Sequence, residues 1–328
     1  MSEIYLLLSV IAAALPVLCY LVFVWWLDRY EREPLWLVGL TFFYGATGAI
    51  FLGVYASAMA MALLAHAGVS TDMSVTAGLI APLCEEPAKG LFLLGLLVGK
   101  NFDNTTDGLV YGAAVGLGFA MTENFFYFLG PYSAGDVEAW TQLVVIRGLF
   151  SALMHASASA TLGATLGYFR YRNNFLQWVG APALGLAVAI CIHAAFNNLL
   201  TLTVRTGDEQ WSVLALAIVP VIVAVLFAVT QLALFAEHKM IQRELEHEAY
   251  AGVLPYSHAL IIPFAGKRKK DGWLPPNLDK AEYIKTATLL AFRRHQARLK
   301  GTDTGSKNRE IHALRMKLTG MLERARMG

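Results

Sequence analysis

The chain has 328 residues, of which 56% are hydrophobic and only 15% charged, and its mean hydropathy is +0.51. Soluble domains carry about a quarter charged residues, so this composition excludes an ordinary soluble protein and indicates a polytopic membrane protein. Residues 237–328 hold 18 of the 26 Lys and Arg but only 10 of the 24 Asp and Glu. We therefore predict a membrane part at 1–236 and a basic, water-facing tail at 237–328.

Seven apolar stretches are long enough to cross a bilayer, which takes about 20 residues in a helix. They lie near 5–27, 35–62, 74–98, 107–129, 142–168, 178–203 and 211–236. The second stretch is long enough to require a tilt or a break near Gly45 and Gly48. The predicted fold class is all-α: a polytopic membrane helix bundle of about seven transmembrane helices, followed by a mostly helical tail.

The loops between these stretches predict the orientation. Five basic residues follow the first, third and fifth stretches: Arg29, Arg32, Lys100, Arg170 and Arg172. The loops on the other side contain only Arg205. Basic loops stay in the cytoplasm, so we predict a multi-pass protein of the cell membrane with its amino terminus outside and its tail in the cytoplasm. We expect no cleavable signal peptide, because a basic region is missing before the first apolar stretch.

The tail is predicted to begin as an extension of the seventh helix and to form further helices at 279–299 and 306–326. Residues 267–270 read KRKK, a basic run that favours attraction to anionic headgroups of the inner leaflet. Binding of nucleic acid is a poorer interpretation, because the run is short and adjoins a membrane domain. The predicted partners are therefore the lipid bilayer and a membrane-anchored protein substrate.

The third stretch, LIAPLCEEPAKGLFLLGLLV at 79–98, carries Glu85, Glu86 and Lys89 near its middle. A charge in the hydrocarbon core costs a few kcal/mol or more, so such residues usually face a partner or a wet cavity. Lys89 is three and four residues from the two carboxylates, so on a helix it can reach either of them. One carboxylate can be neutralised while the other stays available, which indicates an active site or an ion relay. The alternative is a buried salt bridge that only fixes helix packing.

Three further stretches carry polar residues at a similar depth. Counted from the outer boundary at about 1.5 Å per residue, Glu86 and His155 lie about 18–19 Å deep, His193 about 15 Å and Glu123 about 9 Å. Groups from four helices therefore fall in one layer near the midplane. Asn197 lies four residues after His193, so the two share a helix face. The remaining polar candidates are Asn124, Arg147 and, nearer the inner side, Asp107.

These residue types favour activation of a water molecule. GxSxG and HExxH motifs do not occur, so the serine hydrolase and zincin patterns are missing. In one mechanism, Zn²⁺ held by His155, His193 and a carboxylate lowers the pKa of its water, and a second Glu is the general base. In the other, a Glu and a His activate water without metal, and His193 and Asn197 donate hydrogen bonds to the oxyanion. Both hydrolyse a peptide bond within the membrane.

Over residues 20–260, the chain resembles the PrsW family of intramembrane proteases, part of a wider group with the type II CAAX-prenyl endopeptidases and Abi proteins. The motifs are DRYEREP at 28–34, EEPAK at 85–89, DGLVYGAAVGLGFAMTENFFYF at 107–128, the His155 segment and HAAFN at 193–197. The resemblance implies that the chain is a metalloprotease and that it cleaves membrane-anchored proteins such as an anti-sigma factor. The middle motif departs from the wider group, because Glu123 stands four residues after Phe119 where the CAAX enzymes have His. The metal-free Glu–His dyad of those enzymes therefore requires that His155 replace the missing base.

We therefore expect an intramembrane endopeptidase. Glu86 or Glu85 would be the general base, with a preference for Glu86. Glu123, His155 and His193 would be metal ligands or water-orienting groups, and Asn197 and Asn124 would stabilise the oxyanion or orient ligands. Lys89 would neutralise one carboxylate of the Glu pair. Arg147 and Asp107 would support the site by contacting the other site residues. Two alternatives are a proton- or cation-coupled transporter that uses the same polar layer, and a catalytically inactive scaffold.

Overall fold

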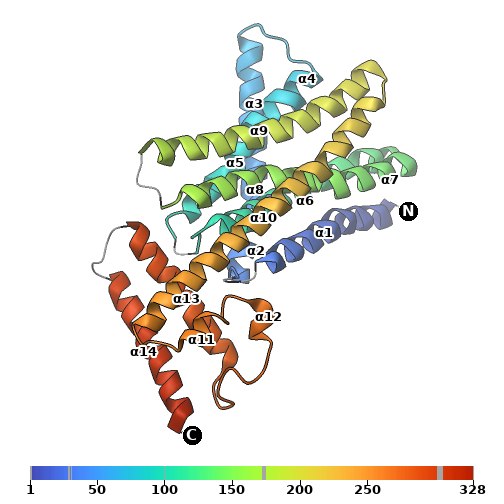
Figure 1. Cartoon of the computed structure of the whole chain (residues 1–328). Coiled ribbons are helices and arrows are strands. Elements are labelled where there is room, and N and C mark those ends of the chain that lie inside the picture. The colour runs from blue at the N-terminus through green and yellow to red at the C-terminus, as the bar shows by residue number, and fades with distance from the viewer. Residues whose placement is uncertain are drawn as a thin grey trace. The chain divides into compact units, whose positions relative to one another are not determined.

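The computed structural model describes residues 2–28, 30, 32–99, 101–171, 175–300 and 306–327. These residues form helices, with no β-strand among them. The chain divides into two compact units (Figure 1). The first comprises Met1–Asp28, Arg32–Arg170 and Asn174–Thr230, and the second comprises Arg29–Glu31, Tyr171–Asn173 and Gln231–Gly328. The predicted all-α class is confirmed.

The first unit contains the helices of the membrane part. They are α1 (Ser2–Leu27), α2 (Leu35–Tyr44), α3 (Ile50–His66), α4 (Met73–Val75), α5 (Ala81–Leu96), α6 (Thr105–Ala134), α7 (Val137–Ile146), α8 (Ala152–Phe169), α9 (Phe175–Thr206) and the first part of α10 (Gln210–Tyr250). Five of the described helices are long and apolar enough to cross a membrane: Ile4–Leu27, Leu35–His66, Val137–Phe169, Val179–Thr206 and Gln210–Tyr250. The predicted count of seven is therefore not confirmed. The other two predicted stretches are helical, in α5 and α6, and carry many of the polar residues.

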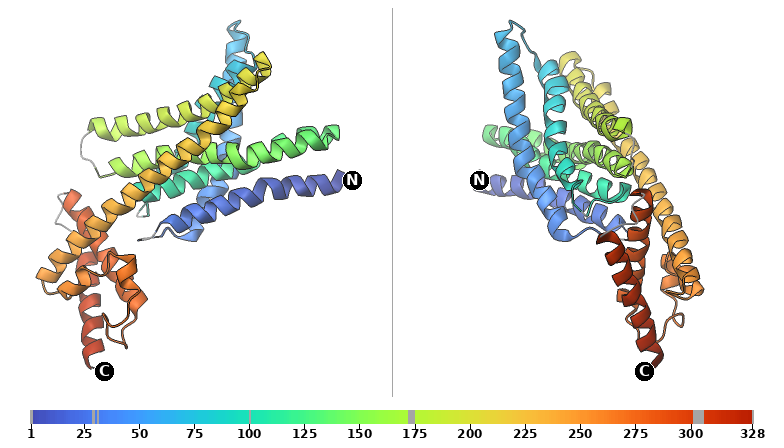
Figure 2. Two further views of the ribbon diagram at one scale, coloured as in Figure 1. Left: turned by 45° about the vertical axis from the view of Figure 1, so that its right-hand side comes forward. Right: turned by 90° about the vertical axis from the view of Figure 1, so that its left-hand side faces the viewer.

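Helix α6 is the centre of this unit, and residues 106–120 along it are buried without interruption. Figures 1 and 2 show α6 beside α8, with which it packs most extensively. Gly108, Gly112 and Gly116 recur every four residues and so share one helix face. A Cβ atom at any of them would lie 2.0–2.3 Å from a backbone oxygen of α8. Small residues at such spacing allow two membrane helices to approach closely, which fixes α8 against α6.

Among the residues that the structure describes, three π-helical segments interrupt the membrane helices: η1 (Gly45–Ala49), η2 (Thr76–Ile80) and η3 (Arg147–Ser151). The first coincides with the break predicted near Gly45 and Gly48. Wider π turns disturb the backbone hydrogen-bond ladder, and in a membrane other groups must then satisfy its carbonyls. Side chains of neighbouring helices do so: Thr122 donates to Ala46, Asn197 to Ala77, Asn198 to Gly78 and Asn124 to Arg147. The π segments are therefore tied to the helices that carry the polar layer.

The second unit is helical and has its own core. It contains the end of α10, α11 (Tyr256–Ala259), α12 (Ala265–Arg268), α13 (Lys280–Lys300) and α14 (Ser306–Met327). The tail helices predicted at 279–299 and 306–326 are thus confirmed, as α13 and α14. Tyr283 and Leu290 of α13 and Leu318 of α14 are fully buried in one apolar cluster. Glu248 is also buried and forms ion pairs with Arg294 and Arg315, so the three helices are joined by charge as well as by packing.

Replacing Gly112 by Ala tests the close approach of α6 and α8. Its Cβ would meet the Ser159 carbonyl at 2.3 Å, so the helices must move apart. Overpacking costs about 1–3 kcal/mol, and we expect Gly112→Ala to lower the thermal unfolding midpoint of the detergent-purified protein. Gly130→Ala is the matched control, because it lies in the same helix with open space around its Cβ. Equal midpoints for the two variants would contradict this packing.

The stability of the second unit should depend on pH through His258. This ring is buried, its Nδ1 lies 2.9 Å from the Tyr283 hydroxyl, and burial lowers its pKa below the ordinary 6.5. At acidic pH the unfolded chain therefore binds a proton that the folded unit does not. As the pH is lowered below about 6.5, the free energy of unfolding of this unit decreases by up to about 1.4 kcal/mol per pH unit. Hydrogen-exchange protection of α13, corrected for intrinsic exchange, should fall accordingly. In His258→Gln the same pH dependence should be reduced, and an unchanged dependence would disprove the assignment.

Candidate functional site

Glu86 of α5 is the most enclosed residue of the polar layer. Its side chain is fully buried, and its Oε1 accepts hydrogen bonds from Lys89 Nζ at 2.7 Å and from His193 Nδ1 at 2.8 Å. Its Oε2 lies 3.5 Å from the Ser159 hydroxyl of α8. A buried charge must be paired and hydrogen-bonded, and here both oxygens have donors. Glu86 therefore joins α5, α8 and α9 and fixes the orientation of the His193 ring.

Lys89 extends this network to the second histidine. Its ammonium donates to His155 Nδ1 at 2.9 Å and lies 3.9 Å from the centre of the Phe119 ring. An ammonium has no acceptor, so Nδ1 of His155 must be unprotonated and Nε2 carries the ring proton. Nε2 then donates to Glu123 Oε2 at 2.9 Å. The neutral His155 ring is therefore held at both nitrogens.

Glu123 forms the more open end of the network. Its side chain is 20% exposed, and its Oε2 also accepts a hydrogen bond from Arg147 at 2.5 Å. Arg147 donates in addition to the Asn124 side chain at 2.9 Å, and its guanidinium lies 3.6 Å from the centre of the Tyr127 ring. The guanidinium is thus fixed from three sides. It balances the charge of Glu123 where the site is most accessible.

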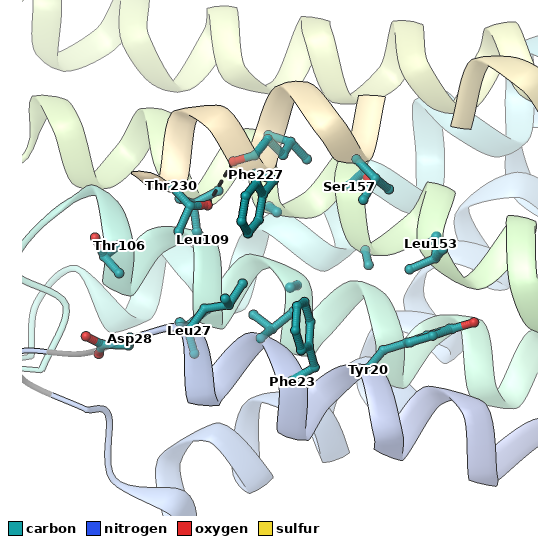
Figure 3. Close-up of a pocket in the computed structure, with 17 residues that line it drawn as sticks. Tyr20, Phe23, Leu27, Asp28, Thr106, Leu109, Leu153, Ser157, Phe227 and Thr230 are labelled. Atoms are coloured by element: carbon teal, nitrogen blue, oxygen red, sulfur yellow. Dashed lines mark hydrogen bonds between the residues drawn. The ribbon is translucent and has the colours of Figure 1, made fainter. Parts of the chain in front are cut away.

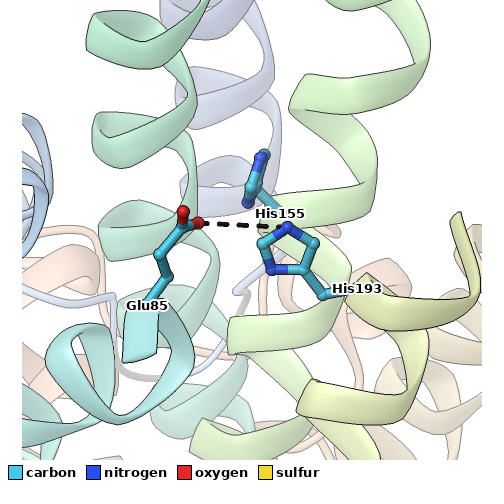
Figure 4. Close-up of side chains that lie close together, drawn as sticks. All are labelled: Glu85, His155 and His193. Carbon is cyan, nitrogen blue, oxygen red and sulfur yellow. Dashed lines mark ion pairs between the residues drawn. The ribbon is translucent and has the colours of Figure 1, made fainter. Parts of the chain in front are cut away.

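Glu85 faces the second nitrogen of His193, as Figure 4 shows. The distance from Glu85 Oε2 to His193 Nε2 is 3.9 Å, and the ring centres of His155 and His193 are 4.7 Å apart. Glu85 Oε2 is buried, and within the described part of the chain it has no hydrogen-bond partner. Gly53 of α3 packs beside this side chain, where a Cβ would lie 3.1 Å from the Glu85 Cγ. Of the two adjacent carboxylates, Glu85 is the one with an uncommitted oxygen.

These residues fit a divalent metal. One ligand atom from each of Glu85, His155 and His193 can be chosen so that all three lie within 4.8 Å of one another. Two imidazoles and one carboxylate form a known ligand set of catalytic zinc sites. A ligating histidine usually donates its other N–H to a carboxylate, and Glu86 accepts that bond from His193. The buried, unbonded Glu85 oxygen is the observation that most favours a cation here.

The structure brings together most of the residues singled out from the sequence. They are Glu85, Glu86, Lys89, Glu123, Asn124, Arg147, His155 and His193. Asn197 instead donates its amide to the Ala77 carbonyl of η2. Asp107 lies sixteen residues before Glu123 on α6, about 24 Å along the helix, and accepts bonds from the backbone of Asp103 and Asn104. Asp107 therefore lies far from the network around Glu86.

Two contributors were not recognised from the sequence. Ser159 lies four residues after His155, and Tyr127 lies four residues after Glu123. This spacing places each on the same helix face as its charged neighbour, and that is the signal that could have identified them.

Comparisons with known proteins agree with this geometry. A model of the family described as PrsW family intramembrane metalloprotease matches residues 33–229. The protein named Protease PrsW from Clostridioides difficile (strain 630) is 24% identical over 211 residues, which cover 64% of this chain and 84% of that protein. Its namesakes from Bacillus subtilis (strain 168) and Geobacillus kaustophilus (strain HTA426) are 28% and 29% identical, over 53% and 55% of this chain and 74% of each relative. No solved structure matches the chain.

A double-mutant cycle tests the coupling of Lys89 and Glu86. Lys89→Met leaves a buried carboxylate without its cation, which costs about 3–5 kcal/mol of stability. The double variant Lys89→Met with Glu86→Gln removes both charges, so we expect it to be more stable than the sum of the two single losses predicts. Denaturant unfolding in detergent measures the difference. Lys280→Met, which removes an exposed partner of Asp271, is the control and should change little. Additive losses at Lys89 and Glu86 would contradict the coupling.

Proposed function

The chain belongs to the PrsW family of intramembrane metalloproteases and is an intramembrane endopeptidase, and we propose that Glu85, His155 and His193 form its metal centre. The proposal rests on one observation: Glu85 Oε2, buried and without a hydrogen bond among the described residues, faces Nε2 of a histidine that Glu86 orients. The family matches do not favour a transporter or an inactive scaffold.

This assignment differs from the one that the sequence favoured. Both Glu86 oxygens have donors, so Glu86 acts as a positioning residue rather than as the general base. Lys89 neutralises Glu86 and holds His155. Glu85 replaces Glu123 among the proposed metal ligands, because Glu123 is paired with Arg147 and is not part of the Glu85, His155 and His193 group.

A bound divalent metal would act as a Lewis acid that polarises the scissile carbonyl group and lowers the pKa of a bound water. His155 could bind it through Nε2 only if its ring proton moved to Nδ1, which would end both the hydrogen bond to Glu123 and the one accepted from Lys89. Losing the bond to Glu123 leaves that carboxylate able to accept a proton from the attacking water. We assign Glu123 as the general base, which would then return the proton to the leaving amine nitrogen. Arg147 keeps the Glu123 carboxylate in place during both transfers.

The proposed substrate is a membrane-anchored protein, such as an anti-sigma factor or another regulatory protein. The proposed location is the cell membrane, with the amino terminus outside and the tail in the cytoplasm, and it rests on the basic loops that the sequence places on one side. The proposed partner of the tail is the anionic inner leaflet. Lys267, Lys269 and Lys270 are exposed at and beyond α12, where they can meet headgroup phosphates.

Separate roles for Glu85 and Glu123 predict different losses. Glu85→Gln and His193→Ala should lose both the bound metal and the cleavage of a reconstituted substrate. Glu123→Gln should keep the metal and lose about 10²–10⁴-fold in cleavage rate, the usual contribution of a general base. Elemental analysis beside a single-turnover cleavage assay in vesicles measures both properties. Glu138→Gln makes the same change at an exposed position of α7 and should behave as the wild type.

The opposite pattern would disprove these roles. If Glu123→Gln lost the metal while Glu85→Gln retained it, the ligand set would be the one that the sequence favoured. If purified, folded protein cleaved its substrate with no divalent metal at all, the metal centre itself would be refuted and a metal-free glutamate mechanism would replace it.

A further inference from the structure

An apolar cavity lies within the first unit, between α1, α6, α8 and α10 (Figure 3). Its volume is about 130 Å³. The floor is made of small, buried residues, among them Ala113, Ala156 and Ala160, which are 4–7% exposed. The rim carries two large aromatic residues, Phe23 of α1 and Phe227 of α10, which are 51% and 47% exposed. Exposed apolar rings therefore flank the opening of the cavity, as expected of a surface that faces hydrocarbon.

The cavity is too small to enclose a transmembrane helix. A helix with its side chains is about 10–12 Å wide, far more than this volume admits. An apolar cavity of about 150 Å³ holds a molecule as small as benzene, so 130 Å³ fits a segment of a hydrocarbon chain. The lining runs from Tyr20 to Leu27 along α1, about 10 Å, which lies within the roughly 15 Å of hydrocarbon in one leaflet. An extended acyl chain has this shape.

The two ends of the cavity differ in chemistry. Figure 3 shows Asp28, Thr106 and Thr230 toward one end, and Tyr20 and Leu153 toward the other. The polar end lies where α1 ends and α6 begins. Arg32 is exposed there: its Nε donates to the Asp28 carbonyl at 3.0 Å, and its guanidinium lies 5.0 Å from the centre of the Trp25 ring. Its positive charge complements a headgroup phosphate.

We propose that this cavity binds one acyl chain of a membrane phospholipid, whose phosphate pairs with Arg32. The chain lies on the alanine floor between Phe23 and Phe227, so the lipid fills the space that separates α1 from α10. The site lies on the faces of α6 and α8 that carry Ala113 and Ala156, and none of its lining residues belongs to the network around Glu86. It is thus a lipid site separate from the network around Glu86.

The test is photo-crosslinking of the full-length protein in vesicles of phosphatidylethanolamine and phosphatidylglycerol. A phospholipid with a diazirine in its acyl chain is added, and adducts are mapped by mass spectrometry. We expect adducts concentrated on the segments that contain Phe23 and Phe227, above those on the lipid-exposed Phe51 of α3. Ala160→Leu fills the floor and should reduce the labelling at least five-fold. Val223→Phe closes the cavity from α10 and provides a second plug should the first variant fail to fold.

Ala224→Leu is the matched control. Ala224 is exposed and adjoins Val223 in the sequence, but unlike Val223 it does not line the cavity. It should leave the labelling unchanged, while Arg32→Gln should reduce it two- to three-fold. Equal labelling of all exposed helices would mean ordinary surrounding lipid and would overturn the proposal. Labelling that survives both plugs would overturn it too. So would stoichiometric displacement of the lipid by a protein substrate, since the cavity would then belong to substrate binding.

Discussion

The buried ion pair of Glu86 and Lys89 is the interaction on which the rest of the site depends. The two residues are three apart on α5 and both fully buried, and each contacts a different histidine: Glu86 holds His193, and Lys89 holds His155. A lone charge at this depth would be costly, so neither residue is tolerable without the other. Their pairing fixes both imidazole rings and leaves the neighbouring Glu85 uncommitted, which is the property that a reactive or metal-binding carboxylate needs.

Close packing of the helix backbones brings the residues around the Glu86–Lys89 pair together. The glycines of α6 let α8 approach until a Cβ would clash, and this contact places His155 of α8 opposite Glu123 of α6. The π segments also help to fix the helices around the site. The side chains of Asn124 and Asn197 donate hydrogen bonds to backbone carbonyls of η3 and η2. In a membrane, where hydrophobic burial does not drive helices together, hydrogen bonds and small residues replace it. The geometry of the site thus depends on residues that do no chemistry.

The sequence predicted which polar residues lie together, and the hydrogen bonds of the structure favour other roles for some of them than the sequence did. Charges in apolar stretches are costly, so Glu86, Lys89, His155 and His193 were identifiable, and counting residues placed them at one depth. Counting residues does not give the rotation of each helix about its own axis. That rotation decides which carboxylate oxygen lies beside which hydrogen-bond donor. Glu86 therefore appeared as the base although its oxygens are both engaged, and Asn197 appeared beside the oxyanion although its amide reaches Ala77. Asp107 was included as a polar residue within an apolar stretch, yet it lies at the far end of α6.

X-ray absorption spectroscopy of the zinc-loaded protein tests the central claim most directly, because it reports the atoms bound to the metal. If Glu85, His155 and His193 hold the ion, the spectrum should contain the signature of two imidazole rings together with oxygen ligands. His193→Ala should remove one imidazole contribution or abolish binding, while Glu123→Gln should leave the spectrum unchanged. A first shell of oxygen atoms alone, or a spectrum that changes with Glu123 and not with His193, would contradict the account.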